Sequence, residues 1–210
     1  MTNMSGYRTE QETFWAGQFG SDYIDRNRSD ALLAGNLAFF SRALRAAGRP
    51  ASCLEFGANV GMNLRALQLL FPALDCHGIE INSDAARSLG EVIPAANVHN
   101  SSILEFTPRR SWDLVLIKGV LIHINPEALP AVYERLAAAT GRHLLIAEYY
   151  NPVPVAVPYR GHAERLFKRD FAGELLDSHP GFELVDYGFV YRRDPSFPLD
   201  DITWFLLRKE

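Results

Sequence analysis

The strongest guide to the fold is a short apolar run that ends in a glycine-rich turn and leads into a helix. Residues 53–56 form the run, Gly57 and Gly61 follow it, and residues 62–71 carry apolar side chains at helical spacing before Pro72. Glycine lets a backbone turn sharply and lets a ligand approach it closely. The segment therefore predicts a strand, a tight turn able to hold a ligand, and a helix that begins at that turn.

The same alternation continues through the middle of the chain. Residues 113–117 are continuously apolar, which is typical of a strand covered on both faces. Asn125 and Pro126 favour the start of a helix, which is expected to reach Gly141. Further strands and a short helix are expected at 76–81, 97–101, 143–147 and 83–90. Strands and helices that alternate with short links predict a doubly wound α/β fold, with helices on both faces of a mostly parallel sheet.

Both ends of the chain depart from that alternation. Trp15, Phe19 and Tyr23 recur at helical spacing, so residues 1–28 are expected to form a helical arm, followed by a helix over 30–47. The C-terminal third is expected to contain a helix and two strands, at 160–178, 182–191 and 202–207. The short polar link between these two strands fits an antiparallel pair at one edge, which makes a seven-stranded sheet.

Composition limits the class of protein. The 210 residues carry 21 Lys+Arg against 25 Asp+Glu, a net charge of −4, and 48% of them are hydrophobic. We expect a single domain over 1–210 that is too acidic to hold nucleic acid through its overall charge. No apolar run is long enough to span a membrane, and the polar N-terminus lacks a signal core, so a cytoplasmic protein is expected. Cys53 and Cys76 are too few for a zinc cluster, no metal site is expected, and both are interpreted as buried strand residues.

Two carboxylates flank the glycine-rich turn and indicate the chemistry of its ligand. Glu55 lies two residues before Gly57, and Glu80 ends the next strand, 19 residues after Gly61. An acid at that strand end can accept hydrogen bonds from both hydroxyls of a ribose. A buried carboxylate at position 55 would repel a pyrophosphate and would suit an ammonium group. Together the two acids indicate a nucleoside that also carries an ammonium.

The pattern Glu55-x-Gly57-x-Asn59-x-Gly61, with Glu80 at the end of the next strand, resembles the class I S-adenosyl-L-methionine-dependent methyltransferases. The resemblance implies the Rossmann-like methyltransferase fold, S-adenosylmethionine as cofactor and methyl transfer as activity. It also implies that the acid–glycine turn binds the methionine part and that the acid at position 80 holds the ribose. Asn59 stands where the family usually has a glycine.

Further cofactor contacts follow from this resemblance, position by position. Ser102 and Ile103, after the third strand, would bracket the adenine, although many family members have Asp where Ser102 stands. Lys118 ends the fourth strand, which lies beside the sulfonium in such enzymes. From the arm, Trp15 and Tyr23 are expected to form a lid over the cofactor. Residues 50–150 form the expected cofactor-binding core, with contacts from Glu55, Gly57, Asn59, Gly61, Asn63, Glu80, Ile81, Ser102, Ile103 and Lys118.

A closer resemblance extends over nearly the whole chain. The chain is similar to the methylases associated with pseudaminic acid biosynthesis, in segments 14–20, 54–59, 118–126, 147–152, 159–162 and 200–205. This resemblance implies a small-molecule acceptor, an anionic sugar or sugar-nucleotide of the nonulosonic acid type, that is methylated on oxygen or nitrogen. No nucleic-acid or membrane partner is expected, given the net charge of −4 and the lack of a long apolar run.

Three residues are candidates for catalysis. Methyl transfer requires the protein mainly to align the acceptor, but a hydroxyl acceptor also benefits from a base. His123, which follows the fourth strand, is the first candidate, and His162 is the second. Glu148 ends the fifth strand, at the edge where open α/β sheets bind ligands. The competing interpretations are a helix-start histidine at 123 and a surface histidine at 162.

The acceptor site is expected within residues 151–180. Arg165, Lys168 and Arg169 have the spacing of one helical face, and with Arg160 they could grip a carboxylate or a phosphate. A solvated basic face is the competing interpretation. Substrate contacts are predicted at Tyr150, Asn151, Tyr159, Arg160 and Arg165.

Other functions stay open or are disfavoured. A non-catalytic S-adenosylmethionine-binding or regulatory subunit would keep the same binding residues, and a methyltransferase of another small-molecule acid or amine is a further alternative. An NAD-dependent oxidoreductase is disfavoured because the turn lacks the G-x-G-x-x-G spacing. A nucleic-acid methyltransferase is disfavoured by the negative charge and by Lys118-Gly119-Val120, which stands where an Asn/Asp-Pro-Pro-aromatic motif would be needed.

Overall fold

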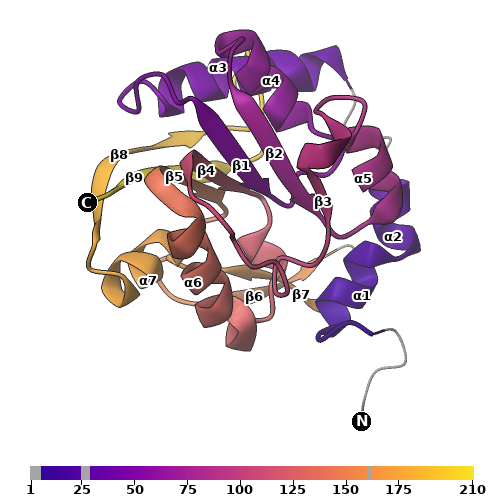
Figure 1. Cartoon of the computed structure of the whole chain (residues 1–210). Helices are drawn as coiled ribbons and strands as arrows, with labels where there is room; N and C mark the ends of the chain where they lie inside the picture. The colour runs from indigo at the N-terminus through magenta and orange to yellow at the C-terminus, as the bar shows by residue number, and fades with distance from the viewer. Residues whose placement is uncertain (1–5, 25–28, 160–161) are drawn as a thin grey trace.

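The central element of the fold is a seven-stranded sheet of order β3-β2-β1-β4-β5-β9-β8 (Figure 1). The structure is a computed structural model that describes residues 6–24, 29–159 and 162–210, with the backbone alone for 159 and 162–165. The strands are β1 (Ser52–Phe56), β2 (Asp75–Glu80), β3 (Val98–Asn100), β4 (Trp112–Lys118), β5 (Thr140–Glu148), β8 (Phe182–Val190) and β9 (Ile202–Lys209). The first five are parallel to one another, and β9 runs antiparallel between β5 and β8. This confirms the predicted fold class, including the antiparallel C-terminal pair.

Helices lie on both faces of the sheet (Figure 1). They are α1 (Glu10–Ala16), α2 (Gln18–Tyr23), α3 (Asp30–Ala43), α4 (Met62–Leu70), α5 (Ser83–Leu89), α6 (Leu129–Ala139) and α7 (Phe171–Ser178). Short 3₁₀ turns occur at η2 (Ala95–Asn97), η3 (Leu121–His123) and η4 (Pro126–Ala128). The helix predicted to begin at Asn125 and Pro126 therefore starts as a 3₁₀ turn and becomes α6 three residues later.

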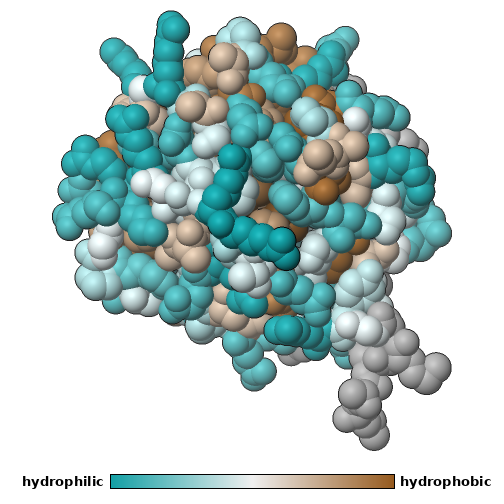
Figure 2. Space-filling view, in the orientation of Figure 1, coloured by the Kyte–Doolittle hydropathy of each residue, from teal (hydrophilic) through white to brown (hydrophobic). Residues whose placement is uncertain are grey.

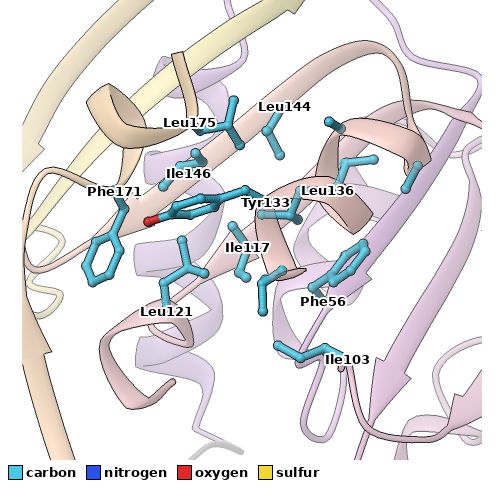
Figure 3. Close-up of a cluster of buried hydrophobic side chains, with 14 of the residues drawn as sticks. Phe56, Ile103, Ile117, Leu121, Tyr133, Leu136, Leu144, Ile146, Phe171 and Leu175 are labelled. Carbon is cyan, nitrogen blue, oxygen red and sulfur yellow. The ribbon is translucent and has the colours of Figure 1, made fainter. Parts of the chain in front are cut away.

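The continuous apolar run in β4 serves two separate cores. Successive strand residues point to opposite faces, so Leu114 and Leu116 pack with α3 and α4, whereas Val115 and Ile117 pack with α6 and α7. Figure 3 shows the second of these cores, where Tyr133 and Leu136 of α6 and Phe171 and Leu175 of α7 meet side chains of the sheet. The sheet is therefore covered on both faces, and its carboxyl edge is the place left for a ligand.

One predicted element is wrong. The helix expected over 160–178 is a β-hairpin followed by a shorter helix, because β6 (Val155–Tyr159) pairs antiparallel with β7 (His162–Lys168) and α7 begins only at Phe171. Asp170 accepts a hydrogen bond from the backbone N–H of Gly173 and caps α7 at that point. The pairing partner, Val155–Tyr159, directly precedes β7 in the sequence, and the helical spacing of the basic residues did not reveal this pairing.

The basic helical face predicted from Arg165, Lys168 and Arg169 is therefore also wrong. Arg165 and Lys168 lie on strand β7, and Arg169 follows it. The Arg169 guanidinium pairs with the Glu174 carboxylate at 2.6 Å, and the Lys168 ammonium lies 5.4 Å from the centre of the Tyr149 ring. Lys168 and Arg169 are thus engaged within the fold, and the three residues do not lie on one helix.

The two cysteines are buried strand residues, as predicted. Cys53 on β1 and Cys76 on β2 are register partners on adjacent strands, and neither forms a disulfide. Burial raises the pKa of the Cys76 thiol to about 12 and raises the pKa of Cys53 in the same direction. Both thiols therefore stay protonated in the folded protein at neutral pH.

Within the described ranges, no helix is both long enough and apolar enough to cross a membrane. The face seen in Figure 2 is dominated by hydrophilic side chains, with apolar patches that are small and scattered.

Gly61 at the start of α4 provides a test of the packing behind the turn. It has a φ of +80°, and an added Cβ would lie 2.7 Å from Leu89 Cδ1, whereas Gly48, with a φ of +74°, has open space around it. We expect Gly61→Ala to lower the free energy of unfolding by about 2–4 kcal/mol, because backbone strain and overpacking add. The matched Gly48→Ala should lose only about 1 kcal/mol from backbone strain. Urea unfolding of both variants measures the difference, and equal losses would contradict the packing argument.

Candidate functional site

A large cavity of about 740 Å³ follows the carboxyl edge of the parallel strands. Its walls come from the segments after β1, β2, β3, β4 and β5, from the start of β9, and from α1, α2 and α3 of the N-terminal part. Ligands of open α/β sheets bind at this edge, close to the point where the strand order reverses. The order reverses here between β1 and β4, and the turn after β1 lies in the cavity wall.

The turn after β1 has the conformation expected of a ligand-binding loop. Gly57 has a φ of +75°, and a Cβ there would lie 2.6 Å from Val120 Cγ2, so only glycine fits. Asn59 has a φ of +48°, in the left-handed region that asparagine tolerates better than most residues. Asparagine therefore adopts here the backbone conformation that a glycine would otherwise supply. Gly57 and Asn59 both line the cavity, whereas Gly61 lies behind it against Leu89.

Glu80 lies at the end of β2 and faces the cavity with its carboxylate held in place. Its two oxygens accept the backbone N–H groups of Asn59 and Asn82, each at 2.8 Å. Burial raises the pKa of Glu80, and the two backbone hydrogen bonds oppose that rise. Each carboxylate oxygen keeps a further lone pair, so the group is able to accept two hydroxyls of a diol. Ile81 lies beside it in the cavity wall.

Glu55 is fully buried and acts on the cavity through Asn63. Its Oε1 accepts a hydrogen bond from Asn63 Nδ2 at 2.6 Å, and Asn63 itself lines the cavity, which Glu55 does not. Burial raises the pKa of Glu55 to about 8, although the bond from Asn63 and the charge of Lys118 oppose the rise. The structure therefore places an amide between this carboxylate and a ligand, where the sequence had suggested direct contact with an ammonium.

The raised pKa of Glu55 makes a prediction about stability. A carboxyl whose pKa is higher in the folded than in the unfolded state loses stability as the pH rises from its ordinary value, 4.5, to about 8. Glu55→Gln removes this titration while keeping an acceptor for Asn63. Across that pH window, the free energy of unfolding should fall less for the variant than for the parent. We expect the difference to be at least about 1.4 kcal/mol, the equivalent of one pKa unit. Urea unfolding at several pH values measures this, with the exposed Glu91→Gln as a control that should follow the parent.

The N-terminal arm closes one side of the cavity. Trp15 and Tyr23, the residues proposed as a lid, both line it, and the Asn82 amide donates to the backbone carbonyls of Trp15 and Gly17 at 3.3 and 3.2 Å. The Trp15 ring lies 4.8 Å from the imidazole of His123. The arm is thus docked on the segment after β2 and reaches the segment after β4.

The segment after β3 forms the far end of the cavity. Ser102 and Ile103 both line it, at the strand end where the resemblance put the adenine. Ser102 Oγ accepts the backbone N–H of Leu104 at 3.0 Å and donates to the carboxylate of Glu12, a residue of α1. The position where many family members have an acid is therefore occupied here by a serine bound to an acid from the arm.

The segment after β4 carries Lys118 and His123 into the cavity wall. Burial lowers the pKa of Lys118, and the nearby carboxylates of Glu55 and Asp200 oppose that shift. Its ammonium lies 5.9 Å from the centre of the Phe39 ring. His123 ends the 3₁₀ turn η3 and is 8% exposed, so its ring is available only from the cavity side.

Glu148 is buried beneath that same turn and does not line the large cavity. Its Oε1 accepts the backbone N–H groups of Val120 and Leu121, both at 2.9 Å. Burial raises the pKa of Glu148 to about 7, and these backbone hydrogen bonds oppose the rise. The contacts of this carboxylate orient the turn that presents His123.

Of the remaining predicted acceptor residues, the two whose side chains the structure describes, Tyr150 and Asn151, do not line the large cavity. Tyr150 is 40% exposed and lines a separate small space, and Asn151 donates to the backbone carbonyl of Val153 at 2.5 Å. Tyr159 ends β6 and His162 and Arg165 lie on β7, but their side chains, like the whole of Arg160, fall outside the described residues.

Sequence reasoning missed several residues that line the cavity. Asn36 of α3 is 1% exposed, and its Oδ1 has no hydrogen-bond partner among the described residues. The sequence signal that could have identified it is the presence of a polar residue in the middle of an apolar helix. Tyr149, Arg192 and Asp200 gather at the same end, and Glu12 lies at the opposite one. In the described ranges, no group of three or more His, Cys, Asp or Glu side chains is arranged to hold a metal ion.

Comparison with known proteins shows which solved structures share this fold. No family model and no curated protein matches the sequence. Among solved structures, the chain is similar to Burkholderia thailandensis 1,6-didemethyltoxoflavin-N1-methyltransferase with bound S-adenosylhomocysteine (TM-score 0.70, 20% identity, 100% of this chain and 93% of that one). It is also similar to Synechocystis magnesium protoporphyrin IX methyltransferase with bound SAM (TM-score 0.68, 16% identity, 100% of both chains).

A third similar structure is the mitomycin 7-O-methyltransferase, with a TM-score of 0.66 and 17% identity; the match covers 96% of this chain but only 61% of that one. The three proteins have different methyl acceptors according to their names, so the likeness concerns architecture. The chain has the Rossmann-like fold of the class I S-adenosylmethionine-dependent methyltransferases.

Proposed function

We propose that the protein is an S-adenosylmethionine-dependent methyltransferase that acts on a small molecule. The observation that carries the proposal is the Glu80 carboxylate, which faces the cavity beside the glycine–asparagine turn and is fixed by the N–H groups of Asn59 and Asn82. A carboxylate held in this way is preorganised to accept a vicinal diol. A nucleoside donor supplies such a diol.

The strand order supports one orientation of the donor. The neighbouring strand ends β3, β2, β1 and β4 present Ser102, Glu80, Gly57 and Lys118 in that spatial order. Adjacent strands lie about 4.8 Å apart, so an extended nucleoside can lie across them. In this orientation the base lies over β3, the ribose over β2 and the amino-acid tail over β1 and β4. Lys118 then faces the carboxylate of that tail, and the amide of Asn63 faces its ammonium.

The acceptor part of the proposal rests on the other end of the cavity. Asn36 of α3, Tyr149 after β5, Arg192 after β8 and Asp200 before β9 line it there, on the side away from β3. Arg192, which also pairs with Asp201, suits an anionic substituent, and the Asn36 Oδ1 and the Asp200 carboxylate suit hydroxyl donors, so this lining fits a polyhydroxylated anion. The resemblance to methylases associated with pseudaminic acid biosynthesis points to the same class, a nonulosonic acid or its nucleotide derivative.

Two residues of the chain would have separate roles in methyl transfer, one as a base and one as a positioning residue. When bound, S-adenosylmethionine supplies a methyl group on a sulfonium, which is already a strong electrophile. His123 is the proposed base, because it lines the cavity at the strand end next to the methionine position. It would accept the proton of an acceptor hydroxyl through its ring. Glu148 would act as a positioning residue through the N–H groups of Val120 and Leu121.

Two measurements test the proposal. Mass spectrometry of the denatured protein should detect copurified S-adenosylmethionine or S-adenosylhomocysteine; NAD in their place would favour the oxidoreductase. Incubation with a methyl-labelled donor should then transfer label to at least one member of a panel of nonulosonic acids and their nucleotide derivatives. Label on a simple acid or amine alone would favour a different acceptor class. Donor binding with no transfer to any panel member would favour the non-catalytic binding subunit.

A further inference from the structure

The buried carboxylate of Glu12 is the cavity group that the proposed function leaves unused. Glu12 lies on α1, is 5% exposed and lines the cavity, and no ion pair to it occurs among the described residues. We propose that Glu12 is a specificity-determining residue that accepts a hydrogen bond from the exocyclic amine of the donor's adenine. This inference rests on the proposed function and adds to it a residue that recognises the base.

The hydrogen bonds of Glu12 leave room for a ligand. Its Oε2 accepts the backbone N–H groups of Arg8 and Thr9, at 2.8 and 2.9 Å, and the Thr9 hydroxyl at 3.3 Å, in a capping box that begins α1. Among the described residues, the donor to its Oε1 is the hydroxyl of Ser102. Each carboxylate oxygen carries two lone pairs, so Oε1 keeps one for a further donor. The capping role needs only Oε2, and the second oxygen is available on the side of Ser102.

The position of Glu12 identifies the donor group that it would meet. Ser102 follows β3, which lies on the side of β2 away from the turn after β1. S-adenosylmethionine carries hydrogen-bond donors at its ammonium, at its two ribose hydroxyls and at its adenine amine. In the proposed orientation, Glu80 binds the two ribose hydroxyls, and the ammonium lies toward β1 and β4. The adenine amine is the donor that remains for a carboxylate at the β3 end.

Two features suit this role better than a purely structural one. A buried carboxylate without a cation is costly, and a further N–H donor from a ligand reduces that cost. The hydroxyl of Ser102 is also directed at Glu12 Oε1 and so fixes the orientation of the carboxylate. The arm therefore supplies the acid that the segment after β3 lacks, from a residue 90 positions away in the sequence.

The test compares two ligands that differ only at position 6 of the purine. S-adenosylhomocysteine has an amine there, and its 6-deamino analogue, built on purine riboside, has only hydrogen. Isothermal titration calorimetry should show that the parent protein prefers the adenosyl compound by roughly tenfold or more, since the analogue leaves the buried carboxylate without this donor. Glu12→Gln keeps the capping box and adds an N–H donor, so the preference should fall toward one. Glu10→Gln, an exposed residue on the same helix, makes the same change of charge and should keep the parent's preference.

The outcomes separate this inference from the proposed function. If the parent binds the adenosyl compound but does not distinguish it from the 6-deamino analogue, the inference is wrong and the proposed function stands. The same conclusion follows if Glu12→Gln keeps the parent's preference. If the parent binds neither compound, both proposals fail. The absence of a preference in the parent needs no variant and would overturn the inference even if Glu12→Gln folded poorly.

Discussion

Replacement of Glu80 by alanine is expected to lower the affinity of the protein for S-adenosylhomocysteine by at least about 100-fold. Two charge-assisted hydrogen bonds to the ribose would be lost, and each such bond contributes about 1.5–3 kcal/mol. The substitution also leaves the N–H groups of Asn59 and Asn82 without their carboxylate partner, which loosens the turn that carries the cofactor. Isothermal titration calorimetry with the purified variant measures the change.

Two controls make this result specific to the diol. Glu91→Ala removes an exposed acid after α5 and should leave the affinity within about threefold of the parent, because surface substitutions away from a site have small effects. Asn59→Gly keeps the backbone N–H and suits the positive φ, so it should also bind normally. Thermal unfolding of each variant shows whether the fold survives. An affinity for Glu80→Ala within tenfold of the parent, with the fold intact, would refute the assignment of the ribose.

His123→Ala is expected to lower kcat for a hydroxyl acceptor by about 10²–10⁴-fold, which is the usual contribution of a general base. Its effect on the affinity for S-adenosylhomocysteine should stay within about threefold, because the groups assigned to the donor remain. The rate of label transfer at saturating donor and acceptor measures the first quantity, and calorimetry measures the second.

The same variant separates two classes of acceptor. A carboxylate or a neutral amine needs no proton removed by the protein before it attacks, so with such an acceptor the loss should be less than about tenfold. Glu148→Gln keeps an acceptor oxygen for the turn beneath His123 and should cost less than His123→Ala with any acceptor. A kcat for His123→Ala near that of the parent, with a hydroxyl acceptor, would rule out His123 as the base.

Much of the sheet could be predicted from the sequence because its signals are local. The apolar run of β4 and the glycine turn after β1 each lie within one short segment, and a few residues decide their conformation. The same is true of Glu80, since its position at a strand end follows from the strand itself. The departure at Asn59 also has a local explanation, because asparagine accepts the left-handed region that the turn needs.

The wrong element is a local hairpin whose pairing the pattern hid, whereas the omissions come from contacts between distant segments. The hairpin of β6 and β7 depends on pairing between Val157 and Leu166, which the helical spacing of the basic residues hid. Glu12 reaches the cavity only because the arm docks on Asn82. Asn36 of α3 likewise meets the cavity only in the folded molecule. Local patterns cannot reveal such neighbours, because packing and not propensity brings these segments together.

The rate at which the adjacent thiols of Cys53 and Cys76 are alkylated reports how often the centre of the sheet opens. Both are buried and protonated, so an alkylating reagent reaches them only when β1 and β2 separate. Those strands end at the turn and at Glu80, the two features assigned to the nucleoside. A ligand that binds both strand ends must therefore slow the alkylation of the two thiols. A ligand that contacts only the outer surface leaves the alkylation rate unchanged.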